Sequence, residues 1–223
     1  MPDAVRKIHN KVDIVLEAAE HIRTEKIPND AQPADPDEDW MNAFIRYAED
    51  ASSERLKKLY SKILAGEIVA PGSFSTSTLR AVSELTMQTA QDFSELYARS
   101  IENWFYRGKE YDRGPEWQRL LRLQEAGFVS PSLDATHQPE LSPWQVGSFP
   151  RLLIYINGYV NARFPRGGLT RIGIETGRLL ARPDVEKNLR AMAAQFPRSN
   201  VEKIVLISDR GSELLYPLEH PNN

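Results

Sequence analysis

Hydroxyl side chains gather in one short stretch of the sequence, at Ser73, Ser75, Thr76, Ser77 and Thr78. A hydroxyl acts as a nucleophile only when a general base lies beside it. No such base stands close to these residues in the sequence. Hydroxyl side chains also accept hydrogen bonds from backbone N–H groups at the start of helices. The stretch therefore predicts a helix N-terminus, and no catalytic residue is assigned.

The sequence lacks the usual residue patterns of metal and cofactor sites. The four histidines are far apart, and none forms a pair at zinc-ligand spacing; they are His9, His21, His137 and His220. There is no cysteine, which excludes disulfides, thiolate zinc sites, iron–sulfur clusters and a cysteine nucleophile. No Asp or Glu is followed two positions later by Lys, the pair that restriction-type nucleases need, and phosphate-binding and nucleophile-elbow motifs are also absent. We therefore expect a protein without metal or cofactor that is not an enzyme.

Arginine is concentrated in residues 151–182, where Glu175 is the one acidic residue; the arginines are Arg151, Arg163, Arg166, Arg171, Arg178 and Arg182. The planar guanidinium fork suits phosphate recognition. The residues that we single out as candidates for binding an anion or nucleic acid are Arg119, Arg122, Arg163, Arg166 and Arg171. A solvated face, or a surface on which the acidic segment 30–39 docks, explains the same arginines equally simply.

The composition is that of a folded protein. Hydrophobic residues make up 41% of the 223 residues and charged residues 26%, so a packed core is expected. The formal net charge of −3 argues against a protein whose whole surface is built for nucleic acid. No run approaches the ~20 apolar residues of a membrane span, and the first residues lack the apolar core of a signal peptide. We expect a cytoplasmic protein.

The first half of the chain shows helical periodicity. An amphipathic helix is predicted over 4–27, with an apolar stripe at Ile8, Val12, Val15, Ala19 and Ile22. Residues 28–39 are acidic and proline-rich and are expected to form a linker. A second helix over 40–50 carries Trp40, Phe44 and Ala48 on one face, and a third follows a serine cap at Ser52 or Ser53 and runs to Leu64.

A tight corner is predicted between residues 62 and 85. Gly66 is placed for a left-handed helix cap, and Pro71 and Gly72 favour a turn. Ser73 or Ser75 then begins a helix that reaches Leu85, with Phe74 tucked into the core. A further helix capped by Thr86 is expected to include Phe93, Leu96, Tyr97, Ile101 and Trp104.

The residues of this corner resemble a known family. Lys62–Ile68 (KILAGEI), Pro71–Ser75 (PGSFS) and Thr78-Leu79, with Trp40 and Ser53 upstream, resemble an uncharacterised bacterial family known as a domain of unknown function. The resemblance covers most of the chain and is strongest from Trp40 to Phe93. It implies no activity. Families of this kind are often met in mobile or anti-phage defence contexts.

The second half of the chain mixes helices and strands. Helices are predicted over 116–126, where Gly127 ends the helix, over 170–180, and over 184–196, where Asp184 is the cap. Strands are predicted over 201–207 and 214–218. Asn157-Gly158 predicts a hairpin between Leu152–Ile156 and Tyr159–Phe164. Leu121–Val129 (LRLQEAGFV), this hairpin and Leu169–Gly173 (LTRIG) are similar to the end of winged-helix domains of the multiple-antibiotic-resistance repressor type. The proline-rich insert over 131–150 departs from that pattern.

Together these features predict an α+β fold that is mainly α. Residues 1–108 are expected to form a helical bundle, and residues 109–223 a winged-helix-like domain with a small antiparallel sheet. We expect a non-enzymatic interaction, sensor or adaptor protein in anti-phage defence, which acts through a partner protein, such as a co-encoded effector, or through homo-oligomers. The alternative is a nucleic-acid-binding regulator that uses the basic second half.

Overall fold

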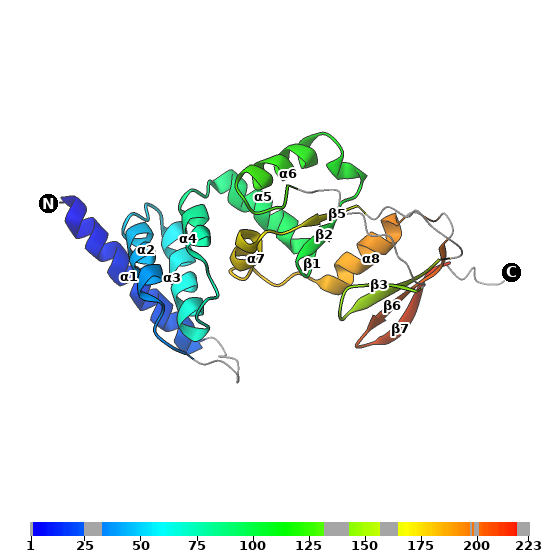
Figure 1. The fold of residues 1–223 in the computed structure, drawn as a ribbon, viewed down its shortest axis with the longest axis horizontal. Coiled ribbons are helices and arrows are strands. Elements are labelled where there is room, and N and C mark those ends of the chain that lie inside the picture. Colours follow the sequence, from blue (N-terminus) through cyan, green and yellow to red (C-terminus); the bar gives the residue numbers. More distant parts are fainter. Residues whose placement is uncertain are drawn as a thin grey trace. The chain divides into compact units, whose positions relative to one another are not determined.

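The computed structural model describes residues 2–24, 33–131, 143–156, 165–196, 198 and 201–217. Over these residues the chain forms eight α-helices, one 3-10 helix and seven strands (Figure 1). By their contacts they divide into two units. Unit 1 comprises residues 1–87 and 171–180, and unit 2 comprises residues 88–170 and 181–223. The chain therefore leaves unit 1, builds most of unit 2, and returns to unit 1 for one short helix. The domain boundary expected near Gly108 stays a prediction.

Unit 1 is helical. It consists of α1 (Pro2–Thr24), α2 (Glu38–Glu49), α3 (Glu54–Val69), α4 (Thr76–Ser83) and α7 (Arg171–Gly177). Of the two serines predicted as candidates at each of these helix starts, the caps are Ser53, whose side chain accepts a hydrogen bond from the Leu56 N–H, and Ser75, whose side chain accepts one from the Thr78 N–H. Trp40, Phe44 and Ala48 of α2 are buried, as their spacing indicates. Of the predicted linker over 28–39, residues 28–32 lie outside the described residues, and α2 already begins at Glu38.

The orientation of α1 differs from the usual one. A helix of a globular protein normally turns its apolar stripe toward the core. Here the buried positions of α1 are Asn10, Ile14 and Ala18, which recur every four residues along the face that packs on α3. The longer stripe that begins at Val5 and Ile8 lies on the opposite face and is exposed. The prediction of a helix here is confirmed. Its apolar stripe, however, lies on the face that points away from the core of unit 1.

Unit 2 contains a three-stranded antiparallel sheet in the order β1-β2-β5. Its strands are β1 (Ser100–Ile101), β2 (Trp104–Tyr106) and β5 (Arg166–Gly168). The prediction of one helix from Thr86 through Trp104 was wrong at its C-terminal end, because α5 (Met87–Ala98) stops before Ser100. Glu102 has a φ of +57° and makes the tight turn between β1 and β2. The 3-10 helix Lys109–Tyr111 and α6 (Pro115–Glu125) follow, and Gly127, with a φ of +81°, ends α6 as predicted.

A second sheet of unit 2 has the antiparallel order β3-β4-β6-β7. The strands are β3 (Trp144–Val146), β4 (Arg151–Ile156), β6 (Val201–Ser208) and β7 (Gly211–Tyr216), and α8 (Val185–Gln195) packs on β4 and β6. The strand predictions over 152–156 and 201–207 are confirmed. In the structure β4 pairs with β3 and β6. The other arm of the predicted hairpin, Tyr159–Phe164, lies outside the described residues, together with the turn at 157–158.

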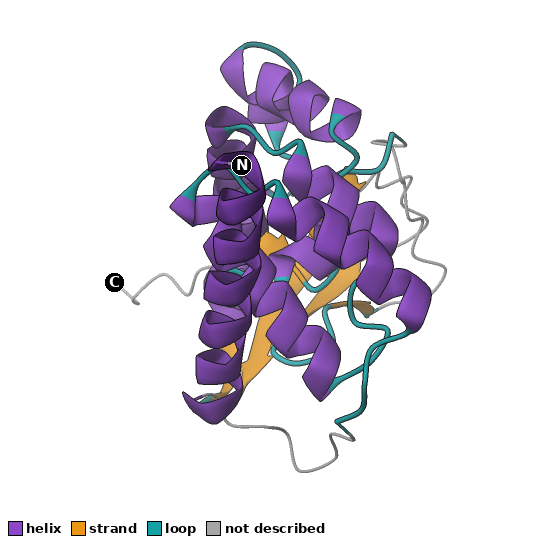
Figure 2. Ribbon diagram, turned by 90° about the vertical axis from the view of Figure 1, so that its left-hand side faces the viewer, coloured by secondary structure: helices purple, strands orange, loops and turns teal. Residues whose placement is uncertain are grey.

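The fold class is confirmed as α+β and mainly α. Figure 2, with helices in purple and strands in orange, shows the excess of helix over strand and the long α1 beside the N-terminal label. Both sheets are small and antiparallel. Within the part of the chain that the structure describes, no helix has the length and apolar character needed to cross a membrane.

Candidate functional sites: the helical corner, the arginines and the outer face of α1

Glu67 holds the corner between α3 and α4. Its side chain is buried near the end of α3, and its two carboxylate oxygens accept hydrogen bonds from the N–H groups of Gly72 (2.6 Å) and Phe74 (2.9 Å). Gly72 has a φ of +82°, a conformation that glycine adopts without strain. An acidic residue near a helix C-terminus is normally unfavourable. Here the carboxylate binds the backbone of the loop that follows.

Glu175 holds the next residues of the same corner from a distant part of the sequence. One of its oxygens accepts hydrogen bonds from the Ser75 N–H (2.6 Å), the Ser75 hydroxyl (2.9 Å) and the Thr78 hydroxyl (2.6 Å). The other oxygen accepts from Nε of Arg171 at 2.6 Å. Glu175 is 3% exposed. Because Ser75 is the N-cap of α4, the carboxylate also lies where a helix favours negative charge.

The hydrogen bonds keep Glu175 ionised. Burial alone raises the pKa of a carboxyl, but here the hydrogen bonds from the Ser75 N–H, Thr78, Arg171 and the Ser75 hydroxyl outweigh burial, so the pKa of Glu175 lies below its ordinary value. A second contact from the same segment reaches the loop, since Arg178 Nη1 donates to the Ser73 carbonyl at 2.9 Å. The segment 171–180 thus fastens onto the corner that α3 and α4 form.

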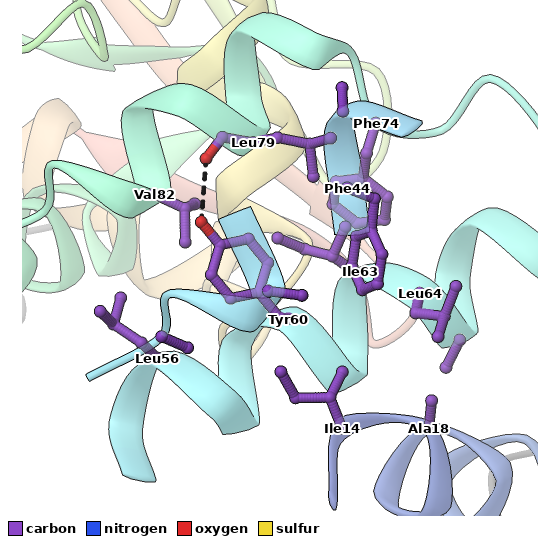
Figure 3. Packing of buried hydrophobic residues seen from close by; sticks show 14 of the residues in the cluster. Ile14, Ala18, Phe44, Leu56, Tyr60, Ile63, Leu64, Phe74, Leu79 and Val82 are labelled. Atoms are coloured by element: carbon purple, nitrogen blue, oxygen red, sulfur yellow. Dashed lines mark hydrogen bonds between the residues drawn. The ribbon is translucent and has the colours of Figure 1, made fainter. Parts of the chain in front are cut away.

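Phe74 is the apolar anchor of the corner. It is 4% exposed, and Figure 3 shows it beside Phe44 and Ile63 in the core of unit 1. The predicted burial of Phe74 is confirmed. The role predicted for Gly66 was wrong: Gly66 lies inside α3, which continues to Val69. A Cβ atom at Gly66 would stand 2.7 Å from Cε2 of Phe74, so glycine is required there by close packing of the ring.

Buried polar groups complete the corner. Nε1 of Trp40 donates to the Phe74 carbonyl at 2.6 Å, and the Tyr60 hydroxyl donates to the Leu79 carbonyl at 3.2 Å, the bond drawn in Figure 3. The hydroxyls of Ser75 and Thr78 are occupied by the Glu175 carboxylate. The Ser75 side chain also accepts a hydrogen bond from the Thr78 N–H, which is the geometry of a helix cap.

The candidate arginines are divided between the two units. Arg119, Arg122 and Arg166 belong to unit 2 and Arg171 to unit 1, while Arg163 lies outside the described residues. Arg171 donates to Glu175, although its side chain is 72% exposed. Arg166 is half-buried on β5, paired through its backbone with Tyr106.

Arg119 and Arg122 are bound to carboxylates of unit 2. Asp92, whose side chain is 1% exposed, accepts hydrogen bonds from Nε (2.9 Å) and Nη2 (2.7 Å) of Arg122, and Nε of Arg119 lies 3.5 Å from its other oxygen. Arg119 also donates to Glu95 at 2.6 Å and to Glu116 at 3.2 Å. These contacts fasten α6 to α5, which gives both arginines a structural role.

The mutation Arg122→Ala is expected to destabilise the protein by about 2 kcal/mol, because it removes charge-assisted hydrogen bonds and leaves a buried carboxylate short of partners. Chemical denaturation of the wild type and the variant measures this. Arg182→Ala, at an exposed position of the same unit, is the control and is expected to change stability by less than about 0.5 kcal/mol. Equal stabilities of Arg122→Ala and wild type would contradict the structural role.

The outer face of α1 carries a continuous apolar stripe, the α1 stripe. Its large members are between 50% and 65% exposed, and they are Val5, Ile8, Val12, Val15 and Leu16. Ala19 continues the line and is also exposed, whereas Ile22 is partly buried against the core of unit 1. Scattered exposed apolar residues are normal, but a contiguous patch indicates an interaction site.

The inner face of α1 is fixed by polar contacts. Nδ2 of Asn10 donates to the carbonyls of Glu49 and Ala51, both at 3.0 Å. Lys7 pairs with Glu49 at 3.2 Å, and Lys57 of α3 pairs with Asp13 at 3.0 Å. A rotation of α1 that buried the stripe would break these bonds and expose Ile14. The stripe is therefore held on the outside.

Sequence reasoning missed both buried glutamates. Each was visible as an acidic residue among apolar neighbours, Glu67 in Leu64–Ile68 and Glu175 in Ile172–Thr176. Over the residues that the structure describes, no group of three or more histidine, aspartate or glutamate side chains is placed to hold a metal ion. His137 and His220 lie outside that part of the chain.

The comparisons with known proteins bear on the helical corner. Residues 5–104 match the family model described as "Protein of unknown function (DUF2806)". The match covers α1 from Val5 onward, all of α2, α3, α4 and α5, and therefore the whole of Lys62–Leu85. The resemblance to an uncharacterised family is confirmed over these residues, and the description states no activity. Neither the search of curated proteins nor that of solved structures found a match. The likeness to winged-helix domains stays a prediction.

Proposed function

We propose that the protein is a non-enzymatic interaction module that binds another protein through the α1 stripe. The single observation that carries this proposal is the row of five large apolar side chains, at least half exposed, on a helix whose other face is fixed to its own unit. Leaving such a row in water costs free energy that binding recovers, at about 25 cal/mol per Å² of apolar surface.

The corner has a supporting role in this proposal. It fixes the C-terminal end of α3 through Glu67, and α1 packs mainly on α3. The two buried carboxylates also explain why polar groups gather at the corner, because those groups donate hydrogen bonds to Glu67 and Glu175. The matched family region contains both the corner and the α1 stripe, so one structural unit holds the exposed face and its support.

A matched set of variants tests the proposal. Val12→Glu places a charge in the α1 stripe, and Met87→Glu makes the same kind of change at another exposed apolar side chain. In a capture experiment the tagged protein is mixed either with a cell extract or with purified, untagged copies of the same chain. Tagged wild type and tagged Met87→Glu are expected to retain the same partner, and tagged Val12→Glu is expected to lose it. Retention by all three proteins would contradict a role of the stripe.

Hydrolysis of a nucleic acid, nucleotide or ester that disappears on one polar substitution would contradict the non-enzymatic proposal.

The biological setting that we propose is a cytoplasmic sensor or adaptor in anti-phage defence, with a co-encoded effector as one kind of partner. Its support is the resemblance of the corner to an uncharacterised bacterial family. The genes beside this one provide the test: a toxic or membrane-active product encoded there supports an effector partner, whereas a divergent promoter with an operator favours regulation of transcription.

The alternative function, a nucleic-acid-binding regulator, rests on the arginine-rich segment 151–182. Because Arg119 and Arg122 are bound to Asp92, the substitutions that test it are Arg163→Ala and Arg166→Ala. Binding to duplex DNA is expected to weaken steeply with salt, since phosphate contacts release counterions. The absence of a gel shift at low salt, or unchanged binding by the double variant, would contradict it.

A further inference from the structure

We infer that the partner of the α1 stripe is a second copy of this chain, whose α1 packs on the first in the antiparallel direction. This inference rests on the proposed function, since it names the protein that the interaction module binds. Four features of α1 support this inference: the spacing of the stripe, the sizes of the facing side chains, the distribution of charge along the helix, and the apolar area available.

The spacing matches that of helices that pack on each other. The α1 stripe alternates steps of three and four residues, at Val5, Ile8, Val12, Val15 and Ala19. Such a 3-4 repeat places one apolar line along a helix, the arrangement in which side chains of one helix fit between those of another. Leu16 widens the line on one side. Two facing helices with this repeat bury it along their whole shared length.

The antiparallel register brings the large Ile8 side chain against the small Ala19 and pairs two valines of equal size. When Val12 of one copy faces Val15 of the other, Ile8 faces Ala19, and the two-fold axis repeats each contact. A two-fold interface needs one self-complementary patch, and the stripe supplies both halves of the Val12–Val15 and Ile8–Ala19 pairs, whereas Val5 faces the partly buried Ile22. The small Ala19 side chain leaves space for Ile8, which is 55% exposed in the single chain.

The charges along α1 favour the antiparallel direction. Residues 3–12 contain three basic residues and one acidic residue, and residues 13–24 contain three acidic residues and one basic residue. In the register above, Arg6 of one copy faces position 21 of the other copy, next to Glu20. In a parallel pair Arg6 of one copy would lie beside Arg6 of the other. In the single chain Arg6 pairs with Asp3, and Glu20 with Arg23, all at exposed positions. Such pairs contribute little, so partners can be exchanged.

The available area suits a modest dimer. The five large side chains expose on the order of 400 Å² together, the size at which an apolar patch marks an interaction site. Two copies with their flanking residues therefore bury roughly 1,000 Å², the lower limit for a specific interface. We accordingly expect a dimer that dissociates on dilution.

Sedimentation velocity of the full chain over a range of concentrations tests the dimer. Wild type and Met87→Glu are expected to move from monomer to dimer as concentration rises, whereas Val12→Glu stays monomeric with an unchanged melting temperature. Wild-type protein that is monomeric at every concentration would overturn the second-copy inference. The capture experiment would still decide whether the stripe binds a different protein, so the two proposals fail separately.

The direction of the helices can be tested because the chain has no cysteine. Ile8→Cys and Ala19→Cys are prepared separately and oxidised, alone and as an equal mixture. Disulfides need Cα atoms closer than about 7 Å. The antiparallel register predicts a covalent dimer in the mixture and none with either variant alone. A disulfide in Ile8→Cys alone, or none in the mixture, would overturn this register.

Discussion

Phe74→Ala is expected to lower the free energy of unfolding of unit 1 by about 3–5 kcal/mol, the usual cost of removing a buried phenylalanine ring. Phe74 is 4% exposed and belongs to the core cluster that also contains Phe44, Tyr60 and Leu79. The Phe74 ring packs directly against Gly66. Removal of the ring therefore leaves a cavity that the surrounding helices close only in part. Urea denaturation, followed by circular dichroism, measures the loss.

The control for Phe74→Ala is Phe149→Ala, because Phe149 is 54% exposed and offers the same chemical change without a buried ring. It is expected to change stability by less than about 0.5 kcal/mol. A Phe74→Ala variant as stable as wild type, but unable to bind its partner, would instead make the corner a binding surface.

Gly66 provides a second test of the same contact. In the wild type, Gly66→Ala is expected to cost about 1–3 kcal/mol, because the new methyl group meets the Phe74 ring at 2.7 Å. In the Phe74→Ala background the ring is absent, and the same substitution is expected to gain up to about 1 kcal/mol from the higher helix propensity of alanine. A change of sign between the two backgrounds would show that Gly66 is required by the ring alone.

The sequence predicted those features that depend on neighbouring residues. The caps Ser53, Ser75 and Asp184 each accept a hydrogen bond from the backbone N–H three residues later, as their side-chain chemistry predicts. The burial of Trp40, Phe44 and Ala48 followed from helical spacing. These signals lie within a few residues of the atoms they contact.

Features that depend on distant contacts could not be predicted in this way. The periodicity of α1 indicated one apolar stripe, but Ile14 and Ala18 with Asn10 were enough to fix the opposite face on α3. The helix expected to reach Trp104 ends at Ala98, because Ser100 and Trp104 belong to strands that pair with each other and with residues 166–168. No local pattern shows which distant strand supplies that pairing.

The corner shows both cases at once. Phe74 was expected in the core because one apolar residue stands among small polar ones, and this was confirmed. The hydroxyls were expected to cap a helix, and Ser75 does so. Their acceptor, Glu175, is separated from Ser75 by 100 residues, so the carboxylate could be assigned to the corner only from the structure.

Glu175→Ala is expected to destabilise unit 1 by about 3 kcal/mol. The substitution removes charge-assisted hydrogen bonds and leaves the Ser75 N–H and the buried Thr78 hydroxyl without their acceptor. Glu175→Gln keeps one oxygen but turns an NH₂ group toward groups that donate, so an intermediate loss is expected. Glu20→Gln, at an exposed glutamate paired with Arg23, is the control and is expected to have almost no effect.

The loss of stability caused by Glu175→Gln is expected to become smaller as the pH falls. The pKa of Glu175 is lowered in the folded protein, so its ionised form stabilises the fold above the pKa of an unfolded glutamate, about 4.3. That contribution is lost as pH falls through the lower pKa of the folded state. The difference in unfolding free energy between wild type and Glu175→Gln is therefore expected to be largest near neutral pH and to shrink below about pH 4. A difference that stays constant, or grows as the pH falls, would mean that the segment 171–180 is held to the corner by contacts other than the Glu175 carboxylate.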